Sequence, residues 1–447
     1  MEFAKRAFRG GVHPPEKKRT KDCPITDIKD ISLVRIPMNM AIGAPCKPTV
    51  KAGDHVDIGQ VIGEPSGIAV PIHASISGKV KAVKAEYMGT GDMMVLVDIE
   101  NDFQYTVADT VTPPVIKDQA SFVAAVKASG LVGLGGAGFP THVKMMPPSD
   151  KKPDVLLINA MECEPYITSD DRQCIENTAS IIRGIAHVLK WQDIPKALIG
   201  IENNKKESAQ ALKDEINAQG QSERMEVRIF PVRYPQGAEK TFIQAATGRI
   251  VPAGGLPHDV NVTMMNVSTV NYLNMYLETG MPLVHRVLTL SGDCPNHPGN
   301  YRVPIGTRIS ELIEKAGGTL REPRKVLMGG PMMGLAMSDY STPVVKNNNA
   351  ILLLDEGADV PKEGPCINCG RCVDACPMGL VPNRLNKATK RKDFDRLDEL
   401  AVMNCIECGC CSYECPARIQ LVQSIRTGKI FYHSALKKLQ EKREAAN

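Results

Sequence analysis

Two segments near the end of the chain, residues 366–377 and 405–416, share the pattern C-x-x-C-x-x-C-x-x-x-C-P. This spacing is typical of [4Fe–4S] motifs in which three cysteines bind one cluster and the fourth binds its neighbour. Three thiolates at three-residue steps can surround a cluster from a tight turn, and the proline redirects the chain. The pattern therefore predicts two clusters with crossed ligands: Cys366, Cys369, Cys372 and Cys415 for the first, and Cys405, Cys408, Cys411 and Cys376 for the second.

A pair of zinc sites is the alternative interpretation of these cysteines. A structural zinc site takes two C-x-x-C pairs, which would leave the third cysteine and the cysteine before the proline of each run without a function. The pattern therefore favours clusters and an electron-carrying role. Cys410 lies beside Cys411, but the register of the repeat selects Cys411 as the ligand.

Length and composition indicate a multidomain chain without a membrane span. The 447 residues, 43% hydrophobic and 4% aromatic, exceed what one compact core accommodates. The longest apolar runs, residues 93–97 and 350–354, are far shorter than a membrane-spanning helix, and the start has no apolar segment typical of a secretory signal. Cluster thiolates require a reducing compartment, so we expect a cytoplasmic location. A net charge of +4 is too small to indicate a nucleic-acid partner.

The first hundred residues divide into an arm and a small β module. Residues 1–30 are basic and rich in proline and glycine, and we expect a solvated arm; docking onto an acidic partner or an anionic lipid surface is the alternative. Residues 31–105 contain short alternating strands that predict a β sandwich. This passage resembles biotinyl/lipoyl-like barrel-sandwich modules, which carry their group on a lysine at a hairpin tip. The tip here, residues 66–71, has no lysine, so we expect a docking scaffold and not a carrier.

The middle of the chain alternates strands and helices. In residues 115–275, helices are expected at 121–129, 178–191, 206–218 and 238–248, separated by apolar strands. This alternation predicts a parallel sheet covered on both faces. Residues 280–345 resemble a β-grasp module of the soluble-ligand-binding (SLBB) type, ended by the polar residues 346–349. Residues 357–447 are expected to form an α-helical domain around the two clusters.

A glycine-rich loop follows the first expected helix of the α/β segment. Glycines at this density let successive backbone N–H groups approach a phosphate without a Cβ clash. The loop departs from the Rossmann fingerprint, because it follows a helix instead of a first strand. By itself it is equally consistent with an ordinary turn. Its glycines are Gly133, Gly135, Gly136 and Gly138.

Further segments, taken with this loop, resemble the flavin-bearing, NADH-oxidising subunit of respiratory complex I. The matching segments are G-L-G-G-A-G-F-P-T-H-V-K at 133–144, N-A-M-E-C-E-P at 159–165, Y-P-Q-G-A-E at 234–239 and M-N-V-S-T at 265–269. The resemblance implies an FMN site and an adjacent nicotinamide-nucleotide site. FMN would be bound by the glycine loop with Lys144, Asn159, Glu162 and Asn266. The nucleotide would lie at Phe139, Glu164 and Glu239, beside the motif residues Tyr234 and Gly237.

Four positions depart from the pattern of that flavin-bearing family. Polar residues of the family are replaced here by Leu134, Met161, Ala238 and Met265. Each replacement removes a polar contact to flavin, ribose or nucleotide. We therefore expect FMN binding to be retained and NAD(H) binding to be weaker.

The order of the parts resembles a whole family. The chain combines F-R-G-G-V-H-P-P at 8–15, a barrel-sandwich module without a lysine at its hairpin tip, a Rossmann-type flavin domain, a β-grasp module and a dicluster ferredoxin domain. This multidomain fold with β, α/β and α parts is similar, over essentially its whole length, to the RnfC family of Rnf electron-transport complexes. The resemblance implies a peripheral subunit on the cytoplasmic side of the cell membrane. It would pass electrons between NAD(H), FMN and two [4Fe–4S] clusters in a ferredoxin:NAD oxidoreductase that translocates Na⁺ or H⁺.

The same resemblance implies the partners. These are integral membrane subunits, a ferredoxin-like iron–sulfur subunit and NAD(H), with no nucleic acid. Hydride passes directly between nicotinamide and flavin, so no catalytic acid or base is expected. Two alternatives use the same parts: a cobalamin reductase of propanediol microcompartments, and an electron carrier that has lost its flavin and retains only the clusters.

Overall fold

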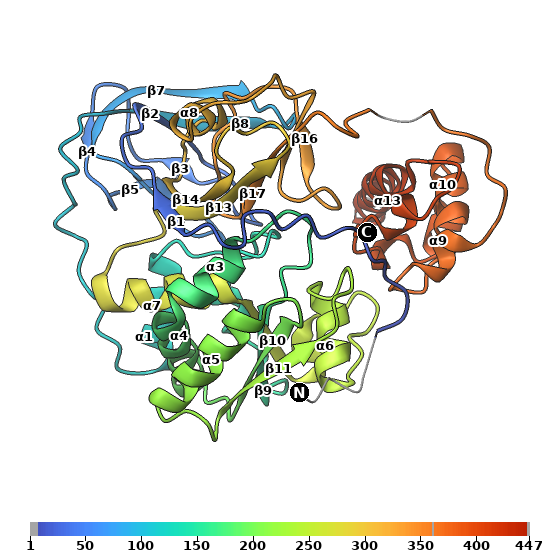
Figure 1. The fold of residues 1–447 in the computed structure, drawn as a ribbon, viewed down its shortest axis with the longest axis horizontal. Helices are drawn as coiled ribbons and strands as arrows, with labels where there is room; N and C mark the ends of the chain where they lie inside the picture. The colour runs from blue at the N-terminus through green and yellow to red at the C-terminus, as the bar shows by residue number, and fades with distance from the viewer. Residues whose placement is uncertain (1–7, 360–361, 445–447) are drawn as a thin grey trace.

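The computed structural model describes residues 8–359 and 362–444, and it has three parts (Figure 1). One part is built of β-sheets, a second of a parallel sheet with helices, and a third, set to one side, of helices alone. The predictions for residues 1–7, 360–361 and 445–447 lie outside the described residues. Within the described chain, no helix is long and apolar enough to span a bilayer.

Residues 33–101 form two small antiparallel sheets. Buried side chains alternate along the strands, as Val34 and Ile36 do, which is the pattern of a sheet with one face in the core. The turn at 66–71 contains Gly67 with a positive φ. The sheets have the orders β2–β8–β7–β4 and β3–β5–β6, with bounds β2 Leu33–Pro37, β3 Lys47–Pro48, β4 His55–Val56, β5 Val61–Glu64, β6 Ile72–His73, β7 Gly78–Tyr87 and β8 Met93–Asn101.

A six-stranded sheet corrects two predicted boundaries. Its order is β1–β14–β13–β17–β15–β16, where the strands are β1 Ile25–Asp27, β13 His285–Gly292, β14 Gly299–Pro304, β15 Lys325–Met328, β16 Leu335–Met337 and β17 Ala350–Leu354, and helix α8 is Ile309–Lys315. Strand β17 lies between β13 and β15, so the unit predicted to end at residue 345 extends to Leu354. Residues 346–349 do not end it, because Arg286 and the Thr289 amide of β13 bind the carbonyls of Asn348 and Asn349. Strand β1 pairs in parallel with β14, so the described residues 8–30 of the predicted arm are not simply solvated.

The predicted parallel sheet is confirmed. Its order is β11–β10–β9–β12, with β9 Val155–Ala160, β10 Ala197–Glu202, β11 Met225–Phe230 and β12 Val262–Asn266. The predicted helices at 178–191 and 206–218 match α4 and α5, and the other helices shift by a few residues. The helices are α1 Gln119–Ala128, α2 Thr141–Lys144, α3 Ser169–Glu176, α4 Thr178–Trp191, α5 Lys206–Ala218, α6 Glu239–Thr247 and α7 Val267–Thr279.

The described end of the chain is helical, as predicted. Its core contains Leu385, Leu397, Val402 and Ile425. The two cysteine runs fold alike: each enters a short helix after a glycine with positive φ, Gly370 or Gly409. The helices are α9 Arg371–Asp374, α10 Pro382–Arg391, α11 Phe394–Glu399, α12 Cys410–Tyr413 and α13 Leu421–Glu444.

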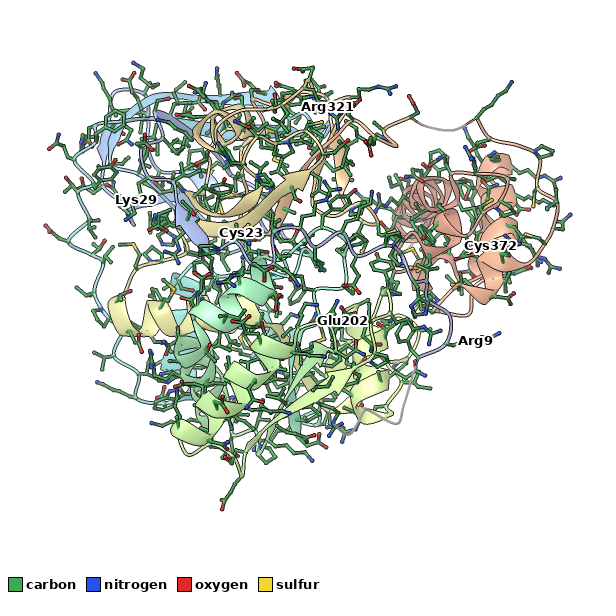
Figure 2. All side chains as sticks on the ribbon, in the orientation of Figure 1. Arg9, Cys23, Lys29, Glu202, Arg321 and Cys372 are labelled. Carbon is green, nitrogen blue, oxygen red and sulfur yellow. The ribbon has the colours of Figure 1, made fainter. Side chains whose placement is uncertain are left out.

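Residues 8–30 cross the molecule. In Figure 1 this blue segment leaves the helical part, runs between the upper and lower parts and ends at β1. Figure 2 shows Arg9 beside the helical part and Cys23 near the middle of the molecule. One short segment therefore contacts all three parts.

Candidate functional site

The cysteines of the two runs gather around two separate cavities. Both linings are otherwise mainly apolar, with Ile419 and Leu421 at the first and Val422 and Ile425 at the second. The fourth cysteine of each run lies at the cavity of the other run, which is the crossed grouping that the spacing predicts. The first cavity is lined by Cys366, Cys369, Cys372 and Cys415, and the second by Cys376, Cys405, Cys408, Cys411 and also Cys410.

These cavities suit an iron–sulfur cluster. The first collects four soft sulfur donors and the second five, including Cys410, and thiolate sulfur is the ligand type that such clusters take. The amides of Leu380 and Glu407 donate to the Sγ atoms of Cys376 and Cys405 at 3.4 Å, as amides beside bound thiolates do. Burial raises the pKa of the Cys405 thiol to about 11, so a thiolate there needs a cationic partner such as iron. Their assignment as ligands stays a prediction.

The two cavities differ in exposure. Cys369 is exposed, and the neighbouring Ile367 has 68% of its surface accessible. By contrast, Cys408, Cys410 and Cys411 are buried. The first cavity therefore lies at the surface of the helical part, and the second lies deeper, toward the α/β part.

The predicted FMN residues converge where the order of the parallel strands reverses. Strands β9 and β12 are neighbours, and Asn159 and Asn266 at their carboxyl ends are direct partners in register. Open α/β sheets bind ligands in the crevice at such a switch point. The glycine loop covers this crevice: a Cβ added to Gly135 would lie 3.4 Å from the Cβ of Asn266.

The loop has the form of an anion cradle. The Gly133 amide donates to the Phe139 carbonyl at 2.7 Å and closes the loop, while residues 135–137 are exposed. Gly136 and Gly138 have φ values of 112° and 65°, which favour glycine. Within the described part of the chain, the amides of residues 135–137 donate to no protein acceptor. They are free to bind a phosphate.

Leu134 anchors this loop to the protein core. Its side chain is fully buried, its amide donates to the hydroxyl of Thr269 at 3.0 Å, and its carbonyl accepts from the buried Arg286 at 2.8 Å. The residue that replaces the family's arginine thus supports the cradle from the core.

Two further predicted residues pair with each other. The Nζ of Lys144 lies 3.3 Å from a carboxylate oxygen of Glu239 and donates to the Met264 carbonyl at 3.0 Å. Lys144 ends α2, directly after the glycine loop, and Glu239 begins α6. Lys144 thus places a half-buried cation at the end of the short helix that follows the cradle, and its role toward a phosphate stays a prediction.

Glu162 caps a helix. Its backbone has a φ of 46°, and its carboxylate accepts from the amides of Asp170 at 2.6 Å and Asp171 at 3.3 Å, at the start of α3. Burial raises the pKa of Glu162 to about 7, opposed by nearby Lys18. Asn266 joins the same network by donating to Asp170 at 2.7 Å. Gly237 accepts from Asn159 at 2.8 Å and belongs to the same crevice.

Glu164 and Tyr234 face other parts of the molecule. The carboxylate of Glu164 accepts from the amides of Met332 at 3.1 Å and Met333 at 2.8 Å, in the loop between β15 and β16. The hydroxyl of Tyr234 donates to the Cys408 carbonyl at 2.8 Å. The Glu164 carboxylate and the Tyr234 hydroxyl therefore already have hydrogen-bond partners within the protein. Both residues lie on the side of the second cluster cavity. Phe139 is half-buried at the end of the loop.

Four family models match successive segments of the chain. Residues 6–104 match the RnfC barrel sandwich hybrid domain, 126–274 the Nuo51 FMN-binding domain, 287–336 the SLBB domain, and 364–437 the 4Fe-4S dicluster domain. The RnfC protein of the Na⁺-translocating ferredoxin:NAD⁺ oxidoreductase complex of Acetobacterium woodii is 42% identical over 428 residues, which cover 94% of this chain and 96% of that protein. The chain belongs to the RnfC family.

Other members of the RnfC family have similar identity. The corresponding protein of the proton-translocating ferredoxin:NAD⁺ oxidoreductase complex of Clostridium ljungdahlii is 40% identical, and the match covers 85% of this chain and 84% of that protein. Its counterpart in the ion-translocating oxidoreductase complex of Rhodobacter capsulatus is 37% identical, with 95% of this chain and 82% of that protein covered. The predicted family and the multidomain order of its parts are thereby confirmed.

Lys18 is the main residue of this RnfC chain that the sequence did not reveal. Its Nζ donates to the carbonyls of Glu162 at 2.6 Å, Glu164 at 3.0 Å and Ile167 at 2.6 Å. Its placement corrects the expectation that the basic residues of the arm are solvated. No local signal marks it, because Lys17, Arg19 and other basic residues surround it in the sequence.

Proposed function

We propose that this chain passes electrons between NAD(H) and two [4Fe–4S] clusters through bound FMN, as one component of an ion-translocating ferredoxin:NAD oxidoreductase. One observation carries this proposal: two four-cysteine cavities and a glycine cradle at a strand switch point occur in one chain and are joined by the Tyr234–Cys408 contact. The RnfC family membership supports the same conclusion.

The flavin would be held in the crevice between β9 and β12. The amides of residues 135–137 would bind its phosphate, and Lys144 would balance the phosphate charge after releasing Glu239. Asn159 and Asn266 would line the crevice at the strand ends. FMN supplies, when bound, the exchange between a two-electron hydride and single electrons. The protein's own task is to orient the flavin and exclude water.

The nucleotide side would be formed by Phe139 and Glu239, which flank the cradle and the lysine. Glu164 was expected there, but we propose another role for it. Its carboxylate orders residues 332–333 against the second cluster, since two loop amides already bind it.

The clusters would take the crossed ligand sets described above. The second cluster would lie nearer the flavin domain and the first at the surface, where a partner reaches it. Five units would build the chain: a crossing segment to residue 30, a barrel sandwich to 105, a flavin domain at 115–279, a β-grasp unit at 280–354 and a cluster domain from 357.

The proposed setting is the cytoplasmic face of the cell membrane. Integral membrane proteins of the complex and a ferredoxin-like protein would be the partners. Relatives at 42% and 40% identity are named for Na⁺ and proton translocation respectively. Because relatives this similar are named for different ions, we propose that the ion passes through other proteins of the complex.

Anaerobic purification tests the proposal. We expect about one FMN, released as a fluorescent compound on denaturation, and about eight iron atoms per chain. NADH should bleach the flavin. Cysteine-to-serine variants of the first run provide matched controls, because they should lose iron and keep flavin.

The same experiment separates the alternatives. A chain with full iron, no flavin and no bleaching by NADH would be an electron carrier only. Co-purification with shell proteins, together with reduction of cobalamin, would instead identify a cobalamin reductase. Co-purification with integral membrane proteins supports the proposal.

A further inference from the structure

We propose that residues 8–18, here called the strap, position the second cluster against the flavin domain and so set the rate of electron passage between flavin and cluster. This inference deepens the proposed function and rests on it. It assigns a role to the F-R-G-G-V-H motif at 8–13, which no part of the flavin or cluster chemistry uses.

At one end, the strap is fixed to the cluster domain. The amide of Gly11 donates to the carbonyl of Ala375 at 2.9 Å. Gly10 has a φ of 70°, and a Cβ added there would lie 2.7 Å from the carbonyl carbon of Cys376. Cys376 is the predicted fourth ligand of the second cluster. The strap therefore contacts the backbone that presents this ligand, at a distance that only glycine allows.

Beyond Gly11, the strap pairs with the flavin domain. Val12 and Tyr234 exchange two backbone hydrogen bonds of 2.8 and 2.9 Å. The guanidinium of Arg233 lies over the ring of Phe8, 4.8 Å from its centroid, and donates to the carbonyls of Phe8 and Gly10. Lys18 then fixes the end of the strap to the loop after β9.

These contacts surround an apolar junction. An apolar cluster joins Val12 of the strap and Tyr234 of the flavin domain to Ala375, Cys408 and Cys410 of the cluster domain. The Tyr234 hydroxyl adds its bond to the Cys408 carbonyl. Of the predicted ligands of the second cluster, Cys408 thus contacts the flavin domain through the Tyr234 hydroxyl, and Cys376 lies against the strap residue Gly10.

Electron passage gives this placement a function. Bound FMN would supply electrons singly, and a [4Fe–4S] cluster would accept one at a time. The rate of such a transfer falls steeply with distance. A rigid junction formed by the strap would therefore keep the second cluster within reach of the flavin, and the first cluster would exchange electrons with the second.

The test is a pair of glycine variants. Gly10→Ala places a Cβ against Cys376, whereas Gly53→Ala also replaces a glycine of positive φ, 98°, but in open space with no atom within 4 Å. In the reconstituted full-length chain, we expect Gly10→Ala to increase hydrogen exchange at the Val12 and Tyr234 amides. Reduction of the clusters by NADH should slow several-fold, because electron transfer weakens with each added ångström between flavin and cluster. Flavin bleaching should stay unchanged, and Gly53→Ala should match the wild type.

A second variant provides the test if Gly10→Ala folds poorly. Phe8→Leu keeps an apolar side chain and removes the ring beneath Arg233, and it should shift exchange and cluster reduction in the same direction. Unchanged exchange in both variants, or faster exchange with an unchanged rate of cluster reduction, would overturn the inference. Loss of flavin bleaching in every protein, including Gly53→Ala, would overturn the proposed function. It would also overturn the proposal that the strap sets the rate of electron passage. Hydrogen exchange at Val12 and Tyr234 would still show whether the strap docks as described.

Discussion

The hydroxyl of Tyr234 lies 2.8 Å from the carbonyl oxygen of Cys408 and donates a hydrogen bond to it. Tyr234 follows the third parallel strand along the chain, β11, and Cys408 is a predicted ligand of the second cluster. A motif residue of the flavin domain and a cluster ligand are therefore in direct contact. At this point the segment after β11 touches the lining of the second cluster cavity directly.

Tyr234→Phe should change the second cluster alone. The ring is retained, but the buried Cys408 carbonyl loses its donor, which costs about 1 kcal/mol of stability. We expect a shift in the reduction potential of the second cluster and no shift in the first, measured by redox titration with electron paramagnetic resonance. Tyr413→Phe is the control, since Tyr413 is exposed. Equal shifts in both clusters would contradict the contact.

The crossed ligand sets predict which cysteine variants behave alike. Cys376→Ser should remove the same paramagnetic signal as Cys408→Ser, although the two residues belong to different runs. Cys415→Ser should in turn match Cys369→Ser. Iron analysis and electron paramagnetic resonance of the four variants provide the measurement. A match between Cys376→Ser and Cys369→Ser would show that each run binds its own cluster.

Lys18→Met should destabilise the α/β part. The variant leaves three carbonyls without their donor and the buried Glu162 without a nearby cation, at a cost of about 3 kcal/mol. Trp191 is the only tryptophan of the chain and lies in α4, so its fluorescence during urea unfolding reports on this part. Lys21→Met is the control, because Lys21 is exposed. Equal stability of both variants would mean that the Lys18 contacts contribute little.

Glu164 should give the protein a pH-dependent stability. Burial raises the pKa of Glu164 from an ordinary 4.5 to about 7, although two loop amides oppose this. The folded state then binds the proton more tightly than the unfolded chain, so the contribution to stability is complete below pH 4.5 and is lost as the pH rises toward 7. Above that range it is constant.

Melting temperatures between about pH 4 and 8 measure this effect. The difference between the wild type and Glu164→Gln should fall across the window from about pH 4.5 to 7 and then level off. Glu223→Gln, at an exposed site, should show a constant difference. A constant difference for Glu164→Gln as well would mean that the carboxyl titrates as it does in water.

Local patterns in the sequence predicted the parts that depend on local physics. Helices α4 and α5 have the predicted bounds because their apolar residues recur at helical spacing. The crossed grouping of cysteines followed from the spacing and from the redirecting prolines. The glycine loop and the crevice at Asn159 and Asn266 come together because the parallel strands end at one edge.

Contacts between distant segments could not be predicted in this way. Strand β1 has three residues and no apolar pattern, and it forms only because β14 offers an unpaired edge. The predicted β-grasp unit ended before β17, because the polar residues 346–349 precede this strand. In the structure, the carbonyls of Asn348 and Asn349 accept hydrogen bonds from β13 and so connect β17 to the sheet. The motif around Glu164 suggested that this residue binds the nucleotide. In the structure, its carboxylate binds the amides of residues 332–333, which are far away in the sequence and which no local pattern could reveal.

The crossing path of residues 8–27 has a consequence for biosynthesis. A ribosome makes this segment well before its partners at residues 300–302 and 375, which lie more than 270 residues further along the chain. The segment must therefore wait for both partners before it can adopt its crossing path. A translation product that stops before residue 300 offers this lysine- and arginine-rich stretch neither partner.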